Sequence, residues 1–185
     1  MKIAISGKGG VGKTTVTANV GASLAKLGKS VVVIDMDIGL RNLDVVMGLE
    51  NRVVYNIMDI IDGRCKISQA LVRDKHLDNL FLLPASQIHN KEDINVEKVV
   101  DIVTTLEGSF DYILLDSPAG IEKGFESSVA PAKEALIVAT PDVSSVRDAD
   151  RVVGIIESKG IFSISLIVNR YDLNLVLKKK MLDFD

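Results

Sequence analysis

The stretch "GKGGVGKTT" at residues 7–15 constrains the fold of this chain more than any other segment. It contains the pattern G-x-x-x-x-G-K-[ST]. The fixed positions of the pattern are Gly7, Gly12, Lys13 and Thr14. A short apolar run at 2–6 precedes the stretch, and an amphipathic segment at 13–26 follows it. A strand, a glycine-rich loop and a helix in this order form a cradle for phosphate, because backbone N–H groups and the helix N-terminus face the anion.

The side chains of this loop have separate expected roles. Lys13 is placed to reach the β- and γ-phosphates of a nucleotide, and the Thr14 hydroxyl is placed to bind Mg²⁺. The nucleotide contacts predicted from the loop are Gly7, Lys8, Gly9, Gly10, Val11, Gly12, Lys13, Thr14 and Thr15. A phosphate loop needs one lysine, so Lys8 is an addition. It is either a solvated surface residue or a group that serves a nucleotide in another subunit.

Apolar runs alternate with amphipathic segments along the whole chain. The predicted strands are 2–6, 30–35, 80–84, 111–116, 134–140 and 163–169. The predicted helices are 13–26, 55–62, 67–73, 95–107 and 143–158. This alternation predicts a three-layer P-loop NTPase fold, α/β in class, with a mostly parallel sheet and helices on both faces. The 185 residues suit a single domain, 1–185.

Composition excludes several other classes of protein. The net charge of −3 does not favour a nucleic-acid binder, which usually carries a basic excess. A single cysteine, Cys65, excludes an internal disulfide and a cysteine cluster for metal. No apolar run approaches the length of a membrane span, and the start of the chain does not resemble a signal peptide. A cytoplasmic location is expected.

Three aspartates follow two of the predicted strands. Asp35 and Asp37 lie at the end of "VVVIDMD", and Asp116 lies at the end of "YILLD". The carboxyl ends of parallel strands meet where open α/β sheets bind ligands. Asp116 is predicted to hold Mg²⁺ through a water molecule, and Asp37 to orient the attacking water. Asp35 supports either the magnesium site or the loop that follows it.

Two residues after the last predicted strand are candidates for binding the base. Asn169 can exchange hydrogen bonds with the edge of an adenine, and Arg170 can stack on its ring. Both residues also suit an ordinary loop after a strand.

The motif K-G-G-x-G-K-[ST] at residues 8–14 resembles that of the deviant Walker A ATPases, the ParA–MinD superfamily. The segments "IGLRNLD", "PAGIE" and "SSVRDADR" are similar to those of the MinD branch, the septum-site-determining ATPases of bacterial cell division. The resemblance runs from residue 1 to about residue 183.

This resemblance implies a homodimer with ATP and Mg²⁺ sandwiched between the subunits. It makes Lys8, Lys13 and Asp37 the catalytic set, with Lys8 reaching the phosphates of the partner. It implies recruitment of MinC, the division inhibitor, to the inner face of the cell membrane, and release by MinE or another topological factor. The residues expected at partner or dimer surfaces are Arg41, Asn42, Asp44, Arg147, Asp148 and Asp150.

The carboxyl-terminal end departs from the resemblance. Family members continue with a strand, a helix and a membrane-targeting amphipathic helix, whereas this sequence stops after "LVLKKKMLDFD". That stretch is short and ends in acidic residues, so it is expected to be a truncated segment and not a membrane anchor.

Three other functions are compatible with parts of the sequence. A ParA-like DNA or plasmid partition ATPase needs a basic surface, which the net charge of −3 disfavours. A flagellar-number regulator of the same superfamily more often has "GLAN" where this chain has "GLRN" at 39–42. A truncated chain could also be catalytically silent and act only as a binding module.

Overall fold

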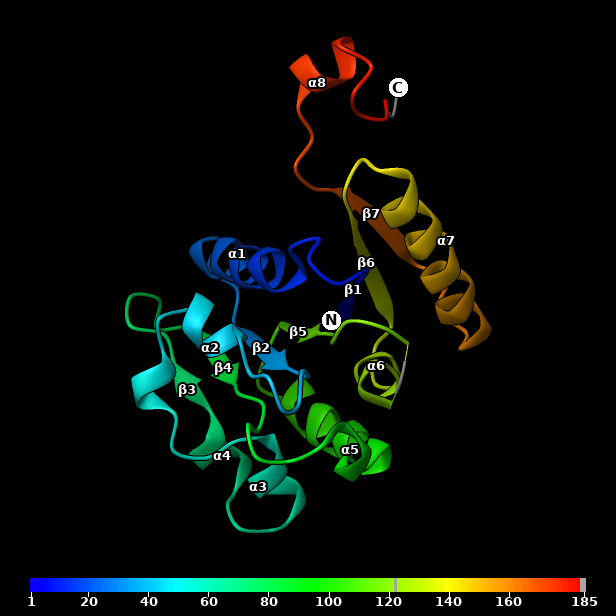
Figure 1. Cartoon of the computed structure of the whole chain (residues 1–185). Helices are drawn as coiled ribbons and strands as arrows, with labels where there is room; N and C mark the ends of the chain where they lie inside the picture. Colours follow the sequence, from blue (N-terminus) through cyan, green and yellow to red (C-terminus); the bar gives the residue numbers. More distant parts are fainter. Residues whose placement is uncertain (122, 184–185) are drawn as a thin grey trace.

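The computed structural model describes residues 1–121 and 123–183, which build one seven-stranded sheet (Figure 1). The strand order is β3-β4-β2-β5-β1-β6-β7, and every neighbouring pair is parallel except β3 with β4. The strands are β1 (Lys2–Ser6), β2 (Val31–Asp35), β3 (Val72–Arg73), β4 (Leu80–Leu83), β5 (Tyr112–Asp116), β6 (Glu134–Ala139) and β7 (Ile164–Val168). The predicted fold class, with its mostly parallel sheet, is confirmed.

Helices cover both faces of the sheet. They are α1 (Lys13–Lys26), α2 (Leu43–Val46), α3 (Ile57–Ile61), α4 (Ile67–Ala70), α5 (Val96–Glu107), α6 (Lys123–Val129) and α7 (Val143–Ser158). Helix α8 (Leu173–Leu177) buries no residue and lies apart from the sheet (Figure 1). Two 3₁₀ turns, η1 (Glu50–Arg52) and η2 (Lys91–Asp93), lie in loops. Helix α1 packs on one face, and α5, α6 and α7 pack on the other (Figure 1).

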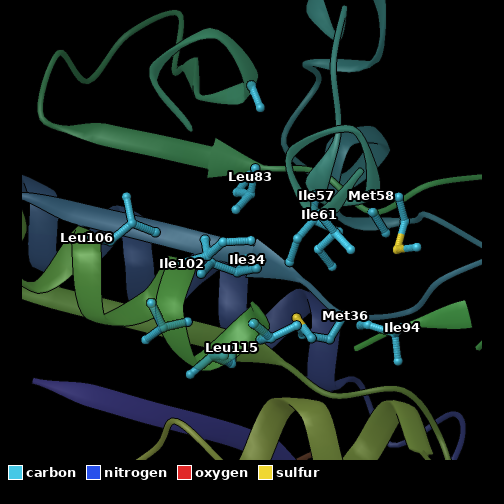
Figure 2. Close-up of a cluster of buried hydrophobic side chains, with 14 of the residues drawn as sticks. Ile34, Met36, Ile57, Met58, Ile61, Leu83, Ile94, Ile102, Leu106 and Leu115 are labelled. Carbon is cyan, nitrogen blue, oxygen red and sulfur yellow. The ribbon is translucent and has the colours of Figure 1, made fainter. Parts of the chain in front are cut away.

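The core beneath the centre of the sheet is formed by β2, β5, α3 and α5 (Figure 2). Its members include Ile34, Leu115, Ile57 and Ile102, each at most 5% exposed. Burying one such side chain stabilises the fold by about 1.5–3 kcal/mol. Strands β2 and β5 are therefore held in place by the core, and they fix the starting points of the loops that follow their carboxyl ends.

Helix α1 buries small residues more deeply than its larger apolar ones. Val16, Val20 and Leu24 are half-buried and pack against the core, while Leu27 is exposed. The buried face carries small residues such as Thr17, Gly21 and Ala25. A Cβ on Gly21 would lie 2.8 Å from Cγ1 of Val33, so the absence of a side chain lets α1 sit close to β2.

The predicted helix at 67–73 is shorter than expected. Helix α4 ends at Ala70, and Val72 then pairs with Leu82 of β4 in antiparallel register. An edge strand can form from two residues when the neighbouring strand offers free backbone groups, and a sequence pattern does not reveal this pairing. Among the described helices, none is both long and apolar enough to cross a membrane.

Candidate functional site

The predicted site residues lie at the carboxyl end of the central strands. In the sheet, Asp35 of β2 is in register with Asp116 of β5, and β5 also pairs with β1. The loop from Gly7 to Gly12 leaves β1 and enters α1 at this same edge. The strand order therefore places the loop directly beside both aspartates.

Two glycines determine the path of this loop. Gly7 has a φ of 143°, and a Cβ there would lie 2.2 Å from the carbonyl oxygen of Val138 in β6. Gly12 has a φ of 100°, and its Cβ would lie 2.6 Å from Nδ2 of Asn169. Both positions therefore require glycine, for conformation and for space. The backbone of the phosphate loop therefore lies close to Val138 at Gly7 and close to Asn169 at Gly12.

Lys13 is buried at the start of α1. Its Nζ donates a hydrogen bond to the carbonyl oxygen of Lys8, at 3.1 Å. Burial lowers the pKa of the Lys13 ammonium, and the nearby carboxylates of Asp116 and Asp37 oppose this shift. The ammonium is thus positioned by the loop itself and faces two anionic groups.

Asp116 is held by hydroxyl groups of α1. The Thr17 hydroxyl donates to Asp116 Oδ1 at 2.9 Å, and the Thr14 side chain also hydrogen-bonds to this carboxyl group. Burial raises the pKa of Asp116 to about 6, although the two hydroxyls and Lys13 act in the opposite direction. A cation bound nearby would favour the ionised form of this carboxyl group.

Asp35 organises the loop that follows β2. Its Oδ1 accepts the N–H of Asp37 at 2.9 Å, and its Oδ2 accepts the N–H groups of Asn42 and Leu43, both at 3.1 Å. Burial raises the pKa of Asp35 to about 7, against the effect of these backbone hydrogen bonds. The contacts of Asp35 favour the loop-supporting role over direct metal binding.

Asp37 is directed to the phosphate loop by this arrangement. It lines a hollow of about 340 Å³ together with residues of the phosphate loop. The other lining residues are Gly9, Gly10, Gly12, Lys13, Thr14, Thr15, Asn42, Ser117, Ala119 and Arg170. Lys91 lies beside Asp37, with 3.5 Å between Nζ and Oδ1.

The hollow fits a polyphosphate and a magnesium ion. It combines backbone N–H groups of a glycine loop, one ammonium, the Thr14 hydroxyl and the Asp37 carboxylate. Within the described ranges, no three Asp, Glu, His or Cys side chains cluster as ligands of a metal ion. This suits Mg²⁺, which keeps several waters and takes substrate phosphates as ligands in place of an all-protein cage.

Lys8 lies on the outer side of the loop and contacts α7. Its Nζ donates to the Ser144 hydroxyl at 2.8 Å and lies 3.6 Å from Asp148 Oδ2. The Ser144 hydroxyl in turn donates to Asp142, the residue that caps α7. Hydroxyls of Ser144 and Thr140, the Ser145 N–H and the nearby Lys8 charge lower the pKa of Asp142 to about 2. Lys8 is therefore held by its own subunit through exposed contacts.

Asn169 supports the phosphate loop with the atoms that were predicted to bind the base. Its Nδ2 donates to the Val11 carbonyl at 2.8 Å, and its Oδ1 accepts the Arg170 N–H at 3.0 Å. Both ends of the amide thus contact backbone in this structure. Arg170 lines the hollow, as a ligand-binding residue would.

The residues predicted at partner surfaces lie in three different places. Asp44 is completely buried and accepts hydrogen bonds from Arg41, so its side chain is part of the interior and not of a contact surface. Asn42 lines the hollow. Arg147 and Asp150 are exposed on α7, beside the half-exposed Asp148.

Three residues of this region were not singled out from the sequence. They are Thr17, Ser144 and Lys91. Thr17 follows Lys13 by one helical turn, a spacing that places both on the same face. Lys91 follows the strand at 80–84, but its role depends on β4 lying next to β2, which the sequence does not show.

Comparison with known proteins identifies relatives over nearly the whole chain. The AAA domain family, AAA_31, matches residues 1–159. The septum site-determining protein MinD of Synechocystis is 55% identical over 183 residues, covering 99% of this chain and 69% of the relative. Bacillus subtilis MinD is 50% identical, covering 97% of this chain and 68% of the relative.

Solved structures give the same result. The MinC:MinD cell division complex of Aquifex aeolicus matches with a TM-score of 0.90 and 52% identity, over 99% of this chain and 74% of that chain. MinD of Pyrococcus horikoshii, complexed with Mg-ADP, matches with a TM-score of 0.84 and 31% identity, over 98% of this chain and 73% of that chain.

Proposed function

The chain belongs to the MinD family of septum site-determining ATPases, and we propose that it is an ATP-driven switch in the selection of the division site. The observation that carries this proposal is the position of Lys13, buried between the phosphate loop and the carboxylates of Asp116 and Asp37. In this proposal residues 1–185 act as one ATPase domain, with ATP as substrate and Mg²⁺ as cofactor. The Mg-ADP complex of the Pyrococcus horikoshii protein supports both ligands.

The residues in and around the hollow have different proposed roles in ATP hydrolysis. Backbone N–H groups of the loop and the Lys13 ammonium would bind the β- and γ-phosphates, and Arg170, which lines the same hollow, is the proposed contact for the rest of the nucleotide. Asn169 supports the loop through the Val11 carbonyl. Thr14, and Asp116 through a water molecule, would hold Mg²⁺, which supplies positive charge to the phosphate oxygens. Asp37 orients the water that attacks the γ-phosphate in line with the leaving oxygen.

Dimerisation is the step that uses Lys8. Its side chain is 40% exposed and is held by the Ser144 hydroxyl and one ion pair at the surface. Such contacts contribute little, so Lys8 can leave α7 and reach the phosphates of a nucleotide in a second subunit. The γ-phosphate would then favour the dimer, and hydrolysis would release it.

The dimer is proposed to recruit a MinC-like inhibitor at the cytoplasmic face of the membrane, with a MinE-like or other topological factor stimulating release. The Aquifex aeolicus MinC:MinD complex supports the first of these partners. Arg147 and Asp150, exposed on α7, are the proposed contact residues, together with Asp148.

The test is capture of immobilised MinC in the presence of a non-hydrolysable ATP analogue or ADP. Wild-type protein is expected to bind with the analogue and not with ADP, and Lys13→Ala is expected to bind with neither. Equal binding to MinC with the analogue and with ADP would contradict the proposed ATP-driven switch. Salt-sensitive binding to DNA with the analogue, without MinC binding, would identify a partition ATPase.

A further inference from the structure

The loop after β4 reaches the proposed catalytic site from the side opposite the phosphate loop. Strand β4 pairs with β2, so the carboxyl ends of both strands lie at the same edge of the sheet. The N–H of Gly39 donates to the carbonyl oxygen of Ser86 at 2.7 Å, which joins the loops after β2 and β4. Through this connection Lys91 comes within 3.5 Å of Asp37.

Asp37 needs a compensating charge at this position. Its Oδ1 is buried and accepts no hydrogen bond from any residue in the described part of the chain. Two other carboxyl groups lie at the same edge of the sheet: Asp35, whose Oδ1 accepts the Asp37 N–H, and Asp116, which is in register with Asp35. A buried carboxylate among other carboxylates is unfavourable unless a cation lies nearby. Lys91 supplies such a cation in addition to Lys13, with its Nζ 3.5 Å from Asp37 Oδ1.

The loop around Lys91 has hydrogen bonds of its own. Lys91 begins η2, and the Asn90 N–H donates to Asp93 Oδ2 at 2.9 Å across this turn. One residue earlier, His89 Nδ1 lies 2.7 Å from the Ser86 hydroxyl, and His89 Nε2 lies 3.8 Å from Asp62. Lys91 therefore extends from a loop that is held by hydrogen bonds. Its side chain is only 28% exposed.

We propose that Lys91 is a positioning residue for hydrolysis, which fixes the Asp37 carboxylate so that Asp37 can orient the attacking water. Lys91 pairs with Asp37 and is not among the residues that line the hollow, so we expect it to act through the geometry of Asp37. This inference rests on the proposed ATPase function. It adds the loop after β4 to a site otherwise built from the phosphate loop and the loops after β2, β5 and β7.

The kinetic test compares Lys91→Met with Lys91→Arg under single-turnover conditions. Lys91→Met is expected to lower the rate of hydrolysis about 10-fold and to leave the Kd for ATP within about 2-fold, because only the orientation of the water is lost. Lys91→Arg is expected to recover most of the rate. Lys29→Met is the matched control, since Lys29 is exposed before the opposite end of β2. An unchanged rate in Lys91→Met, or a weaker Kd at unchanged rate, would overturn the proposal.

A second measurement does not depend on hydrolysis. In urea unfolding without nucleotide, Lys91→Met is expected to lower the midpoint by about 0.5 M. In the Asp37→Asn background, the same substitution is expected to have little effect, because the charge that Lys91 compensates is gone. If Lys91→Met lowered the urea midpoint equally in wild type and in Asp37→Asn, the proposed pairing of Lys91 with Asp37 would be wrong. If wild-type protein hydrolyses no ATP, the proposed function fails, whereas this cycle still decides whether Lys91 holds Asp37.

Discussion

The inner and outer sides of the phosphate loop differ in burial and in what holds them. On the inner side, Lys13 is 8% exposed and faces Asp116, which is 3% exposed and bonded to Thr17. On the outer side, Lys8 is 40% exposed, and its ion-pair partner Asp148 is 49% exposed. One loop of the chain therefore carries one lysine in a fixed environment and another in a solvated one.

This difference separates two tasks. A charge that stabilises a phosphate during reaction works best when it is already positioned and shielded from water, as Lys13 is. A charge that must change partners works best when its present contacts are weak, as those of Lys8 are. The inner side thus suits chemistry within one subunit, and the outer side suits association between subunits.

Loss of the inner lysine is expected to have the largest effect. Lys13→Ala removes the ammonium that faces the phosphates, so ATP affinity should fall about 100-fold or more and hydrolysis should become undetectable. Isothermal titration with ATP and Mg²⁺ measures the first effect. Lys29→Ala, at an exposed site beyond α1, is the control and should bind as wild type does. Comparable ATP affinity in both variants would show that the inner side does not bind phosphate.

The inner carboxylates are expected to give a measurable dependence of stability on pH. The pKa of Asp116 is raised from 3.8 to about 6 in the folded chain, so between pH 4 and pH 6 the folded state binds a proton that the unfolded state has lost. The free energy of unfolding should therefore fall as the pH rises through this range, by up to about 1.4 kcal/mol per pH unit from this group. Urea unfolding at several pH values, without nucleotide or Mg²⁺, measures the slope.

Asp116→Asn is the matching variant for this pH dependence. This variant has no titrating group at position 116. Asp35, whose pKa is raised to about 7, is then the remaining buried carboxyl group with a raised pKa. The slope between pH 4 and pH 6 should become shallower than in wild type. Equal slopes would mean that the buried carboxyl group of Asp116 does not hold a proton in this range.

A substitution on the outer side of the phosphate loop is expected to have the smallest effect. Asp148→Asn removes the ion-pair partner of Lys8, which frees the lysine without disturbing a buried group. Dimer association with a non-hydrolysable ATP analogue should strengthen by up to about 5-fold, the upper range for an exposed pair. Glu157→Gln, exposed near the other end of the same helix, is the control. Weaker association in Asp148→Asn would show that Asp148 contacts the partner and does not restrain Lys8.

The parts of the molecule that depend on local pattern were predictable from the sequence. The loop at 7–15, the strand before it and the helix after it are contiguous, so motif and context agree. The runs ending at Asp35 and Asp116 are continuous and apolar, as buried parallel strands are, and α7 begins and ends as its periodicity predicts. These elements also position the proposed inner side of the site.

The remaining features depend on contacts between segments far apart in the chain. The most deeply buried residues of α1 are small because the helix lies close to β2, and hydrophobicity alone does not reveal this close approach. Lys91 joins Asp37 only because β4 is the neighbour of β2. The amide of Asn169 has suitable chemistry for a base, but the structure uses it to hold the Val11 carbonyl.

The central claim is that Lys8 makes the nucleotide site a shared one, and sedimentation velocity tests it most directly. Wild type, Lys8→Ala and Lys13→Ala are compared with a non-hydrolysable ATP analogue and Mg²⁺. Wild type is predicted to sediment as a dimer. Lys8→Ala is predicted to bind the analogue with an affinity within about 3-fold of wild type and to remain a monomer, because the lost charge acts on the other subunit. A Lys8→Ala variant that dimerises as wild type does would contradict the account.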